Sequence, residues 1–255
     1  MLILTSPAKT MNFESEVPKT DSSNPRFYEQ TQDLISILKT WDIDTIRLRM
    51  SVSDTIAQRT YHQFQNWSFQ IKSKQSKPAI FAYAGDVFRQ LKLYEYSVQQ
   101  MKYLNGSLRI LSGLYGILCP LDLIHPYRLE MKTRIRTESI DHLGSFWAPK
   151  ITEALNSDIE NGDHSLVLNL ASQEYSKAVD KEICSVPVID VEFRQRKNGA
   201  EKMIPILAKR ARGMMIEWCV QNNATTFEDL ERFDMDGYSL SNRETNSLVF
   251  VRNHP

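Results

Sequence analysis

The stretch Leu166-Val-Leu-Asn-Leu-Ala-Ser172 is an apolar run that ends in small and polar residues. The residues that follow it, from Glu174 to Val179, are typical of a helix. A short apolar run, a tight turn and a helix together form the repeating unit of α/β proteins. The stretch therefore predicts a buried strand whose carboxyl end opens into a turn that carries polar side chains.

The same unit recurs elsewhere in the chain. The further predicted strands, each with the residues that end it, are Leu2–Leu4 with Pro7, Ala79–Ala84 with Gly85-Asp86, and Leu108–Leu111 with Ser112-Gly113. Helices are expected after the last two of these, from Val87 to about Leu93 and over Leu114–Leu118. Because ligands bind outside the carboxyl ends of strands in α/β sheets, polar residues in these turns are candidates for one site.

The rest of the chain alternates between helical and strand patterns. Helices are predicted over Phe27–Leu38, through Ile46 and Leu48, from Ser53 onward, and over Ala208–Cys219. Asn198-Gly199 predicts a hairpin between Val186–Arg194 and Met203–Leu207, and Ser247–Arg252 predicts a closing strand. No repeat or linker is visible. We therefore predict one α/β domain over residues 1–255, a mixed sheet flanked by helices, with a mixed α+β arrangement left open.

Composition excludes several classes of protein. The 255 residues are 42% hydrophobic and 24% charged, and 31 basic residues balance 31 acidic ones. Such a chain is neither disordered nor a uniformly basic coat for nucleic acid. No apolar run approaches the roughly 20 residues of a spanning helix, and no secretory signal precedes the first strand. We expect a cytoplasmic protein that does not enter a membrane.

The zero net charge conceals two segregated stretches. Between Phe193 and Arg212 there are seven basic residues and one acidic residue, a net charge of +6. From Glu217 to Asp236 six acidic residues face Arg232, a net charge of −5. The polarisation favours an anionic partner, although two solvated faces would explain it equally well.

No metal site, cofactor or redox disulfide is expected. The histidines stand singly, without metal-ligand spacing, at His62, His125, His142, His164 and His254. Cys119, Cys184 and Cys219 are irregularly spaced and read as reduced thiols that are dispensable for folding. Around Cys184 and Cys219 the neighbours are apolar, which raises a thiol pKa and argues against a redox switch.

Motifs for nucleotide hydrolysis are absent, and the glycines of Leu111–Leu118 need another explanation. Gly113 and Gly116 resemble the turn of a helix-hairpin-helix, whose backbone N–H groups hold phosphate. Two residues separate these glycines where the motif has one. We interpret them as part of a strand-to-helix turn that needs glycine for a positive φ or close packing.

Several motifs in order along the chain resemble the bacterial YaaA family of peroxide stress resistance proteins. The matching stretches are Met1–Thr10, Ala84–Phe88, Leu111–Gly116, Pro120–Asp122, Pro126–Met131, Phe146-Trp147, Asn169–Ser172, Glu174-Tyr175 and Lys209–Gly213. The resemblance implies a single mixed α/β fold with a positively charged cleft, DNA binding, and a role in limiting unincorporated iron and oxidative DNA damage.

The polar positions carried over by the resemblance form the candidate site. The expected DNA- or anion-binding residues are Lys9, Arg128, Lys177, Lys209, Arg210 and Arg212, and their polar partners in the cleft are Asp86, Glu130 and Glu174. Lys9 and Arg128 are expected at the cationic centre. An internal network of ion pairs is the alternative interpretation, because buried charges are usually paired. Tyr115 and Tyr127 are candidates for stacking on bases.

The chain also departs from the pattern of the family. Cys119 stands where relatives often carry Arg, and Ala84 stands where they often carry Lys, so two charges are missing from the expected cleft. The helix-hairpin-helix of the family would fall at about Asp44 to Trp67 with its turn at Ile56–Arg59, where Gln58 replaces a glycine. We do not expect that hairpin to capture phosphate.

Three hypotheses about function follow. The leading one is a monomeric DNA-binding stress protein that contacts phosphates with weak sequence preference. The second is an enzyme that uses Lys9, Asp86, Arg128 and Glu174 on a small anionic or nucleobase-type substrate. The third is an iron-binding buffer with Asp234 and Asp236 as oxygen ligands. The shape of the cleft and the pairing of its charges distinguish the first two hypotheses.

Overall fold

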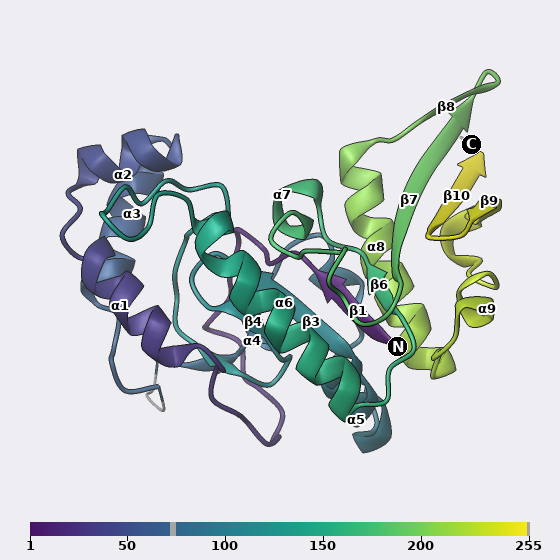
Figure 1. The fold of residues 1–255 in the computed structure, drawn as a ribbon, viewed down its shortest axis with the longest axis horizontal. Helices are drawn as coiled ribbons and strands as arrows, with labels where there is room; N and C mark the ends of the chain where they lie inside the picture. The colour runs from purple at the N-terminus through teal and green to yellow at the C-terminus, as the bar shows by residue number, and fades with distance from the viewer. Residues whose placement is uncertain (72–74, 254–255) are drawn as a thin grey trace.

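Eight strands form one mixed sheet in the computed structural model, which describes residues 1–71 and 75–253 (Figure 1). The strand order is β4-β3-β1-β6-β7-β10-β9, and β8 pairs with β7. The strands are β1 (Leu2–Thr5), β3 (Leu108–Ser112), β4 (Gly116–Leu118), β6 (Val167–Asn169), β7 (Val188–Lys197), β8 (Ala200–Lys202), β9 (Ser239–Glu244) and β10 (Ser247–Asn253). A separate pair joins β2 (Lys77–Pro78) to β5 (Leu123–Ile124). The described residues thus form the single α/β domain that the sequence predicts.

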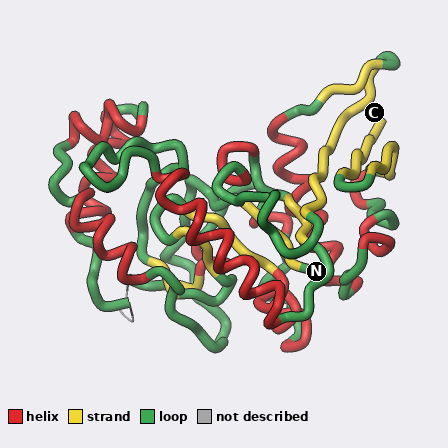
Figure 2. The backbone as a smooth tube through the Cα atoms, in the orientation of Figure 1, coloured by secondary structure: helices red, strands yellow, loops and turns green. Residues whose placement is uncertain are grey.

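Helices cover both faces of the sheet. They are α1 (Tyr28–Leu38), α2 (Ile43–Met50), α3 (Asp54–Gln65), α4 (Ala79–Ala82), α5 (Val98–Ser107), α6 (Leu143–Asn161), α7 (Gln173–Ser176), α8 (Pro205–Asn222) and α9 (Phe227–Leu230), with 3₁₀ turns η1 (Phe88–Gln90) and η2 (Met235–Gly237). In Figure 1, α6 passes in front of the strands and contacts β4, whereas α5 and α8 contact each other behind them. Figure 2 shows α2 and α3 at one end of the molecule and the projecting β7–β8 hairpin at the other.

The direction in which the chain leaves the central strands changes between β1 and β6. β1 pairs in parallel with β3 on one side and with β6 on the other. The chain runs from β1 toward β3, but from β6 it runs away from β1 toward β7. At such a switch point no connection crosses the carboxyl ends of the two strands, and a crevice is left there.

Four local predictions were wrong. Residues 79–84 form no strand, because Ala79–Ala82 is the short helix α4, and the expected helix after it is only the 3₁₀ turn η1. The chain after β3 turns back as β4 instead of entering a helix. Short apolar runs that are buried on every side carry no periodicity that separates helix from strand. Finally, the second hairpin strand covers only Ala200–Lys202, since Pro205 already begins α8.

The proposed turn of the helix-hairpin-helix was also misplaced. Residues 56–59 lie inside α3, so Gln58 is a helical residue and not a turn residue. The connection between α2 and α3 runs through Ser51, which adopts a left-handed conformation with φ of 52°. Asp42 caps the start of α2 by accepting a hydrogen bond from the Thr45 amide at 2.8 Å.

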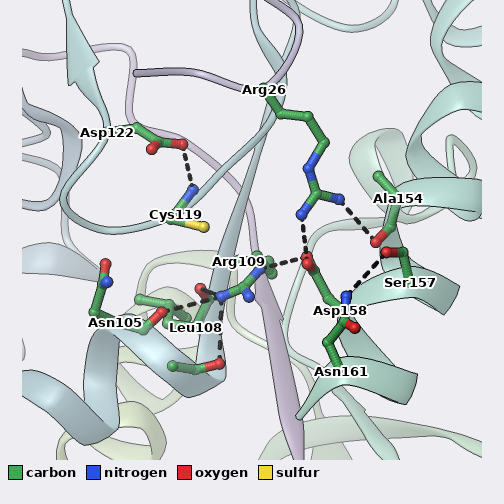
Figure 3. Close-up of polar contacts among 11 residues, drawn as sticks. Arg26, Asn105, Leu108, Arg109, Cys119, Asp122, Ala154, Ser157, Asp158 and Asn161 are labelled. Atoms are coloured by element: carbon green, nitrogen blue, oxygen red, sulfur yellow. Dashed lines mark hydrogen bonds and ion pairs between the residues drawn. The ribbon is translucent and has the colours of Figure 1, made fainter. Parts of the chain in front are cut away.

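A buried ion pair joins the sheet to α6 (Figure 3). Arg109, in the middle of β3, donates from Nε to Oδ2 of Asp158 on α6 at 2.7 Å, and both side chains are less than 10% exposed. Arg26 contacts the other carboxylate oxygen of Asp158. The Arg109 guanidinium also donates to the carbonyls of Asn105 and Leu108 at the end of α5. Asp158 therefore joins α6 to β3 and to the N-terminal segment, and Arg109 extends this network to the end of α5.

Glycines allow two close backbone contacts and one turn with positive φ around the sheet. A Cβ on Gly213 of α8 would lie 2.2 Å from the carbonyl oxygen of Val87, and one on Gly113 would lie 2.4 Å from that of Leu129. Gly116 adopts a φ of +72° at the turn into β4. The sequence predicted that these glycines provide a positive φ or close packing, and Gly116 and Gly113 do so respectively. Their turn joins two strands and not a strand and a helix.

We predict that Gly213→Ala lowers the free energy of unfolding by about 1–3 kcal/mol, because the added methyl group overpacks the contact between α8 and Val87. Gly106→Ala is the matched control, since it also lies in a helix but a Cβ there meets nothing within 4 Å. That change should be neutral or stabilising by up to about 1 kcal/mol. Denaturant unfolding of both variants tests the account, and equal stability losses would contradict it.

Candidate functional site

A cavity of about 870 Å³ lies at the carboxyl ends of β1 and β6. Its walls come from the loop after β1, the segment around Gly85, the Tyr127–Glu130 segment, α7 and the first turns of α8. The Ser6 hydroxyl donates to Oγ of Ser172 at 3.2 Å and accepts from the Ser172 amide at 2.9 Å. These bonds join the loops that follow β1 and β6. The cavity thus occupies the switch point of the sheet.

Most of the predicted site residues line this cavity. Those that do are Lys9, Asp86, Arg128, Glu130, Glu174, Lys209 and Arg212. Arg210 lines a neighbouring hollow of about 620 Å³, together with Arg89 and Arg252. Asp86 lines both hollows. Lys177 is exposed directly after α7 and lines neither of them.

Glu130 is the centre of a cluster of three cations. Its Oε1 lies 3.0 Å from Lys9 Nζ and 3.2 Å from Arg128 Nη2, and its Oε2 lies 3.4 Å from Lys132 Nζ. Burial raises the pKa of this carboxyl, but the hydrogen bond and charge of Lys9 and the charges of Lys132 and Arg128 lower it further, so the net shift is downward. Lys132 was not among the predicted residues.

A second polar group on the far side of β6 was missed by the sequence reasoning. Asn169 donates from Nδ2 to Asp190 on the neighbouring β7 at 2.6 Å, and Lys181 contacts both Asp190 oxygens at 2.6–2.7 Å. These residues line the cavity, as does Glu192. Asn169 is the last residue of β6 and the next-to-last residue of the predicted apolar run, and that position was the available signal. No motif in the sequence points to Asp190 or Lys181.

The cavity is balanced in formal charge but not evenly paired. Five cationic side chains and five carboxylates line it. Lys9, Arg128 and Lys181 pair with carboxylates, whereas Lys209 and Arg212 on α8 make no ion pair with any residue that the structure describes. The Nε of Arg212 is buried without a hydrogen-bond partner, and burial lowers the pKa of this guanidinium. Positive charge that is not neutralised is therefore concentrated on the α8 wall.

The two charged stretches of the sequence are partly neutralised. In the β7–β8 hairpin, Arg194 pairs with Glu192 at 2.5 Å, and Arg196 pairs with Glu201 at 2.6 Å. In the acidic stretch, Glu217 is only 2% exposed and accepts from the Lys92 amide at 3.1 Å. Glu217 is therefore an internal hydrogen-bond acceptor and not part of a solvated acidic face.

Neither tyrosine proposed for base stacking is available. Tyr115 is fully buried, and its hydroxyl accepts a hydrogen bond from the His125 amide at 3.0 Å. Tyr127 is 5% exposed, and its hydroxyl lies 2.7 Å from that of Tyr83 and 2.6 Å from Oγ of Ser112. Burial raises the pKa of Tyr127 to about 12. Both rings belong to the core.

The side chains that could bind a metal ion do not cluster in the described part of the chain. Within residues 1–71 and 75–253, no three His, Cys, Asp or Glu side chains come together as metal ligands, and Asp236 instead pairs with Arg252. His254 lies outside the described residues. No helix in the same ranges combines the length and apolar composition that crossing a bilayer demands.

All three cysteines are free thiols. Burial raises the pKa of Cys119 to about 11, and it also raises the pKa values of Cys184 and Cys219. The rise expected for Cys184 and Cys219 is confirmed. Cys119 lies beside Asp122, whose carboxylate accepts from the Cys119 amide, and not in the cavity (Figure 3).

The fold and this cavity define an α/β protein with a charge-lined cleft at the carboxyl edge of its sheet. A model of the family described as peroxide stress protein YaaA matches residues 1–244. The chain is 39% identical over 256 residues to a UPF0246 protein of Hahella chejuensis, with all of both chains covered. It is also 39% identical over 254 residues to one of Flavobacterium johnsoniae, with 99% of this chain and all of the relative covered. The chain belongs to the peroxide stress protein YaaA family.

We predict that Arg128→Ala costs about 1–3 kcal/mol of stability, because it leaves the buried Glu130 with weaker pairing. Lys9→Ala should cost less than about 1 kcal/mol, since Lys9 is 61% exposed. The pKa of Glu130 is lowered in the folded state, so its pairing stabilises the protein above the ordinary value of 4.5 and is lost as the pH falls through the lowered value. The deficit of Arg128→Ala, measured by denaturant unfolding, should therefore shrink in acid. A pH-independent deficit, or an equal one for Lys9→Ala, would contradict the account.

We also predict that the three thiols resist oxidation by dilute hydrogen peroxide at neutral pH, because the reactive thiolate is scarce when the pKa is raised. Intact-mass measurement of the treated protein should show unmodified cysteines. A variant that combines Cys119→Ser, Cys184→Ser and Cys219→Ala should fold and retain its function. Rapid formation of a sulfenic acid or a disulfide in the folded protein would contradict this prediction.

Proposed function

We propose that this protein acts in the cytoplasm during peroxide stress by binding the DNA backbone along the cleft, as a monomer and with weak sequence preference. Membership of the YaaA family supports the link to peroxide stress. The observation that carries the DNA-binding proposal is the α8 wall. Lys209 and Arg212 line the cavity from this wall without carboxylate partners in the described ranges, and Arg210 lines the adjoining hollow.

A polymeric anion fits this arrangement better than a single small one. Asp86 lines both hollows, and both receive cations from α8. A chain of phosphates can follow cations that are spread over two hollows with a shared wall residue, and backbone contacts of this kind carry little sequence information. We further propose that the protein contributes to limiting unincorporated iron, a role that the resemblance to the YaaA family implies.

A second candidate function is supported by the size of the cavity. A volume of about 870 Å³ lies within the range of small-molecule sites, and the position at a switch point is typical of them. Lys9, Asp86, Arg128 and Glu174 would then act on a small anionic or nucleobase-type substrate. In that case a mononucleotide should bind as tightly as an oligonucleotide and displace it completely.

We predict that the affinity for duplex DNA falls steeply with salt, by about 40-fold between ~50 and ~200 mM if about three phosphates are contacted. Lys209→Ala and Arg212→Ala should each weaken binding and reduce the salt slope by about 1. Lys102→Ala is the matched control, because Lys102 is exposed on α5, which enters the sheet at the amino end of β3.

Fluorescence anisotropy titrations of two duplexes with unrelated sequences provide the measurement. Similar affinities for the two sequences and a steep salt dependence support the proposal. Salt-independent binding, or equal losses for Lys102→Ala and Lys209→Ala, would show that the cleft does not hold the DNA backbone. Complete displacement of DNA by a mononucleotide would favour the second candidate function.

A further inference from the structure

The cluster around Glu130 has an unusual distribution of exposure. The Glu130 side chain is 6% exposed and that of Arg128 is 19% exposed, whereas Lys9 and Lys132 are 61% and 62% exposed. The cluster joins two segments, because Lys9 follows β1 and the other three residues lie in the stretch before α6. One buried carboxylate thus holds two solvent-facing ammonium groups near each other.

Stability alone does not explain this convergence. Arg128, two residues from Glu130, already provides the buried carboxylate with a charged donor. Ion pairs of largely exposed lysines contribute little to stability, because water screens them and ordering the long side chain costs entropy. With three cations and one carboxylate, the cluster carries a net formal charge of +2. Both lysine ammonium groups are accessible to solvent.

Without Glu130 the cluster would disperse. The three cations repel one another, and each lysine has a flexible four-carbon stem. Oε1 of Glu130 contacts Lys9, and Oε2 contacts Lys132, so the carboxylate sets the separation of the two ammonium groups. Groups that are held in place before binding lose less freedom when a ligand arrives.

We propose that Lys9, Arg128 and Lys132 form a subsite for one phosphate group of the DNA backbone and that Glu130 is the positioning residue of this subsite. The inference rests on the proposed function. Lys9 and Lys132 contact the phosphate oxygens as point charges, while Arg128 fixes the buried side of the cluster. Glu130, although negatively charged, therefore promotes the binding of an anion.

If Glu130 positions the lysines, Glu130→Gln should change the DNA affinity in the direction opposite to the one that net charge predicts. The substitution makes the protein more positive by one charge, which by long-range attraction would tighten DNA binding. If Glu130 positions the lysines, the same substitution should weaken binding by about tenfold and reduce the salt slope by about 1, the effect of losing one phosphate contact. Glu138→Gln is the matched control, since Glu138 is exposed in the same stretch and lines no part of the cavity.

The experiment measures the binding of a labelled duplex oligonucleotide to Glu130→Gln, Glu130→Asp, Glu138→Gln, Lys9→Ala and Lys132→Ala by anisotropy at several salt concentrations. Circular dichroism and thermal melting verify folding. We expect weaker binding and a smaller slope for Glu130→Gln, Lys9→Ala and Lys132→Ala. Glu130→Asp should be intermediate, and Glu138→Gln should bind as tightly as the unmodified protein or slightly more tightly.

The outcomes separate this inference from the function on which it rests. If Glu130→Gln binds as tightly as the unmodified protein or more tightly while Lys9→Ala binds more weakly, the positioning role is wrong and DNA binding stands. If Glu130→Gln does not fold, Lys132→Ala decides, and undiminished binding by this surface variant overturns the subsite. If the unmodified protein shows no salt-dependent binding, the proposed function itself fails.

Discussion

The parallel pairing of β1 with both β3 and β6 is the constraint on which the cleft depends. Because the chain leaves these strands toward opposite sides, no connection covers their carboxyl ends. The loops that follow β1 and β6 meet there through Ser6 and Ser172, and they direct Lys9 and Glu174 toward one cavity. The close approach of α8 to Val87 at Gly213 closes another side. The position of the site is therefore a consequence of strand order.

Among the residues that the structure describes, the cleft has one side where the charged residues are paired and one side where the cations are unpaired. On one side, buried Glu130 collects three cations, and Asp190 pairs with Lys181. On the α8 side, Lys209 and Arg212 have no carboxylate partner in the described part of the chain. An equal count of charges thus coexists with local positive charge, because pairing and not composition decides which charges remain available to a ligand.

The sequence predicts β1 and β6 and the loops after them that carry the site, because each strand is a short apolar run followed by small or polar residues. It fails at Ala79–Ala82 and after Ser112, where runs of fully buried residues carry no periodic signal. Motif resemblance placed Lys9, Arg128 and Glu130 together, but Lys132, an exposed loop lysine, follows no pattern. Arg109 lies inside the apolar run of β3, and no motif in the sequence points to its buried partner. Only the fold shows that this partner is Asp158.

The proposed function requires DNA to lie across the carboxyl ends of β1 and β6. A crystal structure of the protein with a short oligonucleotide is the most direct test. Backbone phosphates should then lie within hydrogen-bond distance of Lys9, Lys132 and the α8 side chains Lys209 and Arg212. DNA bound instead against α2 and α3, at the left of the molecule in Figure 1, with the cleft free of phosphate, would contradict the proposed function.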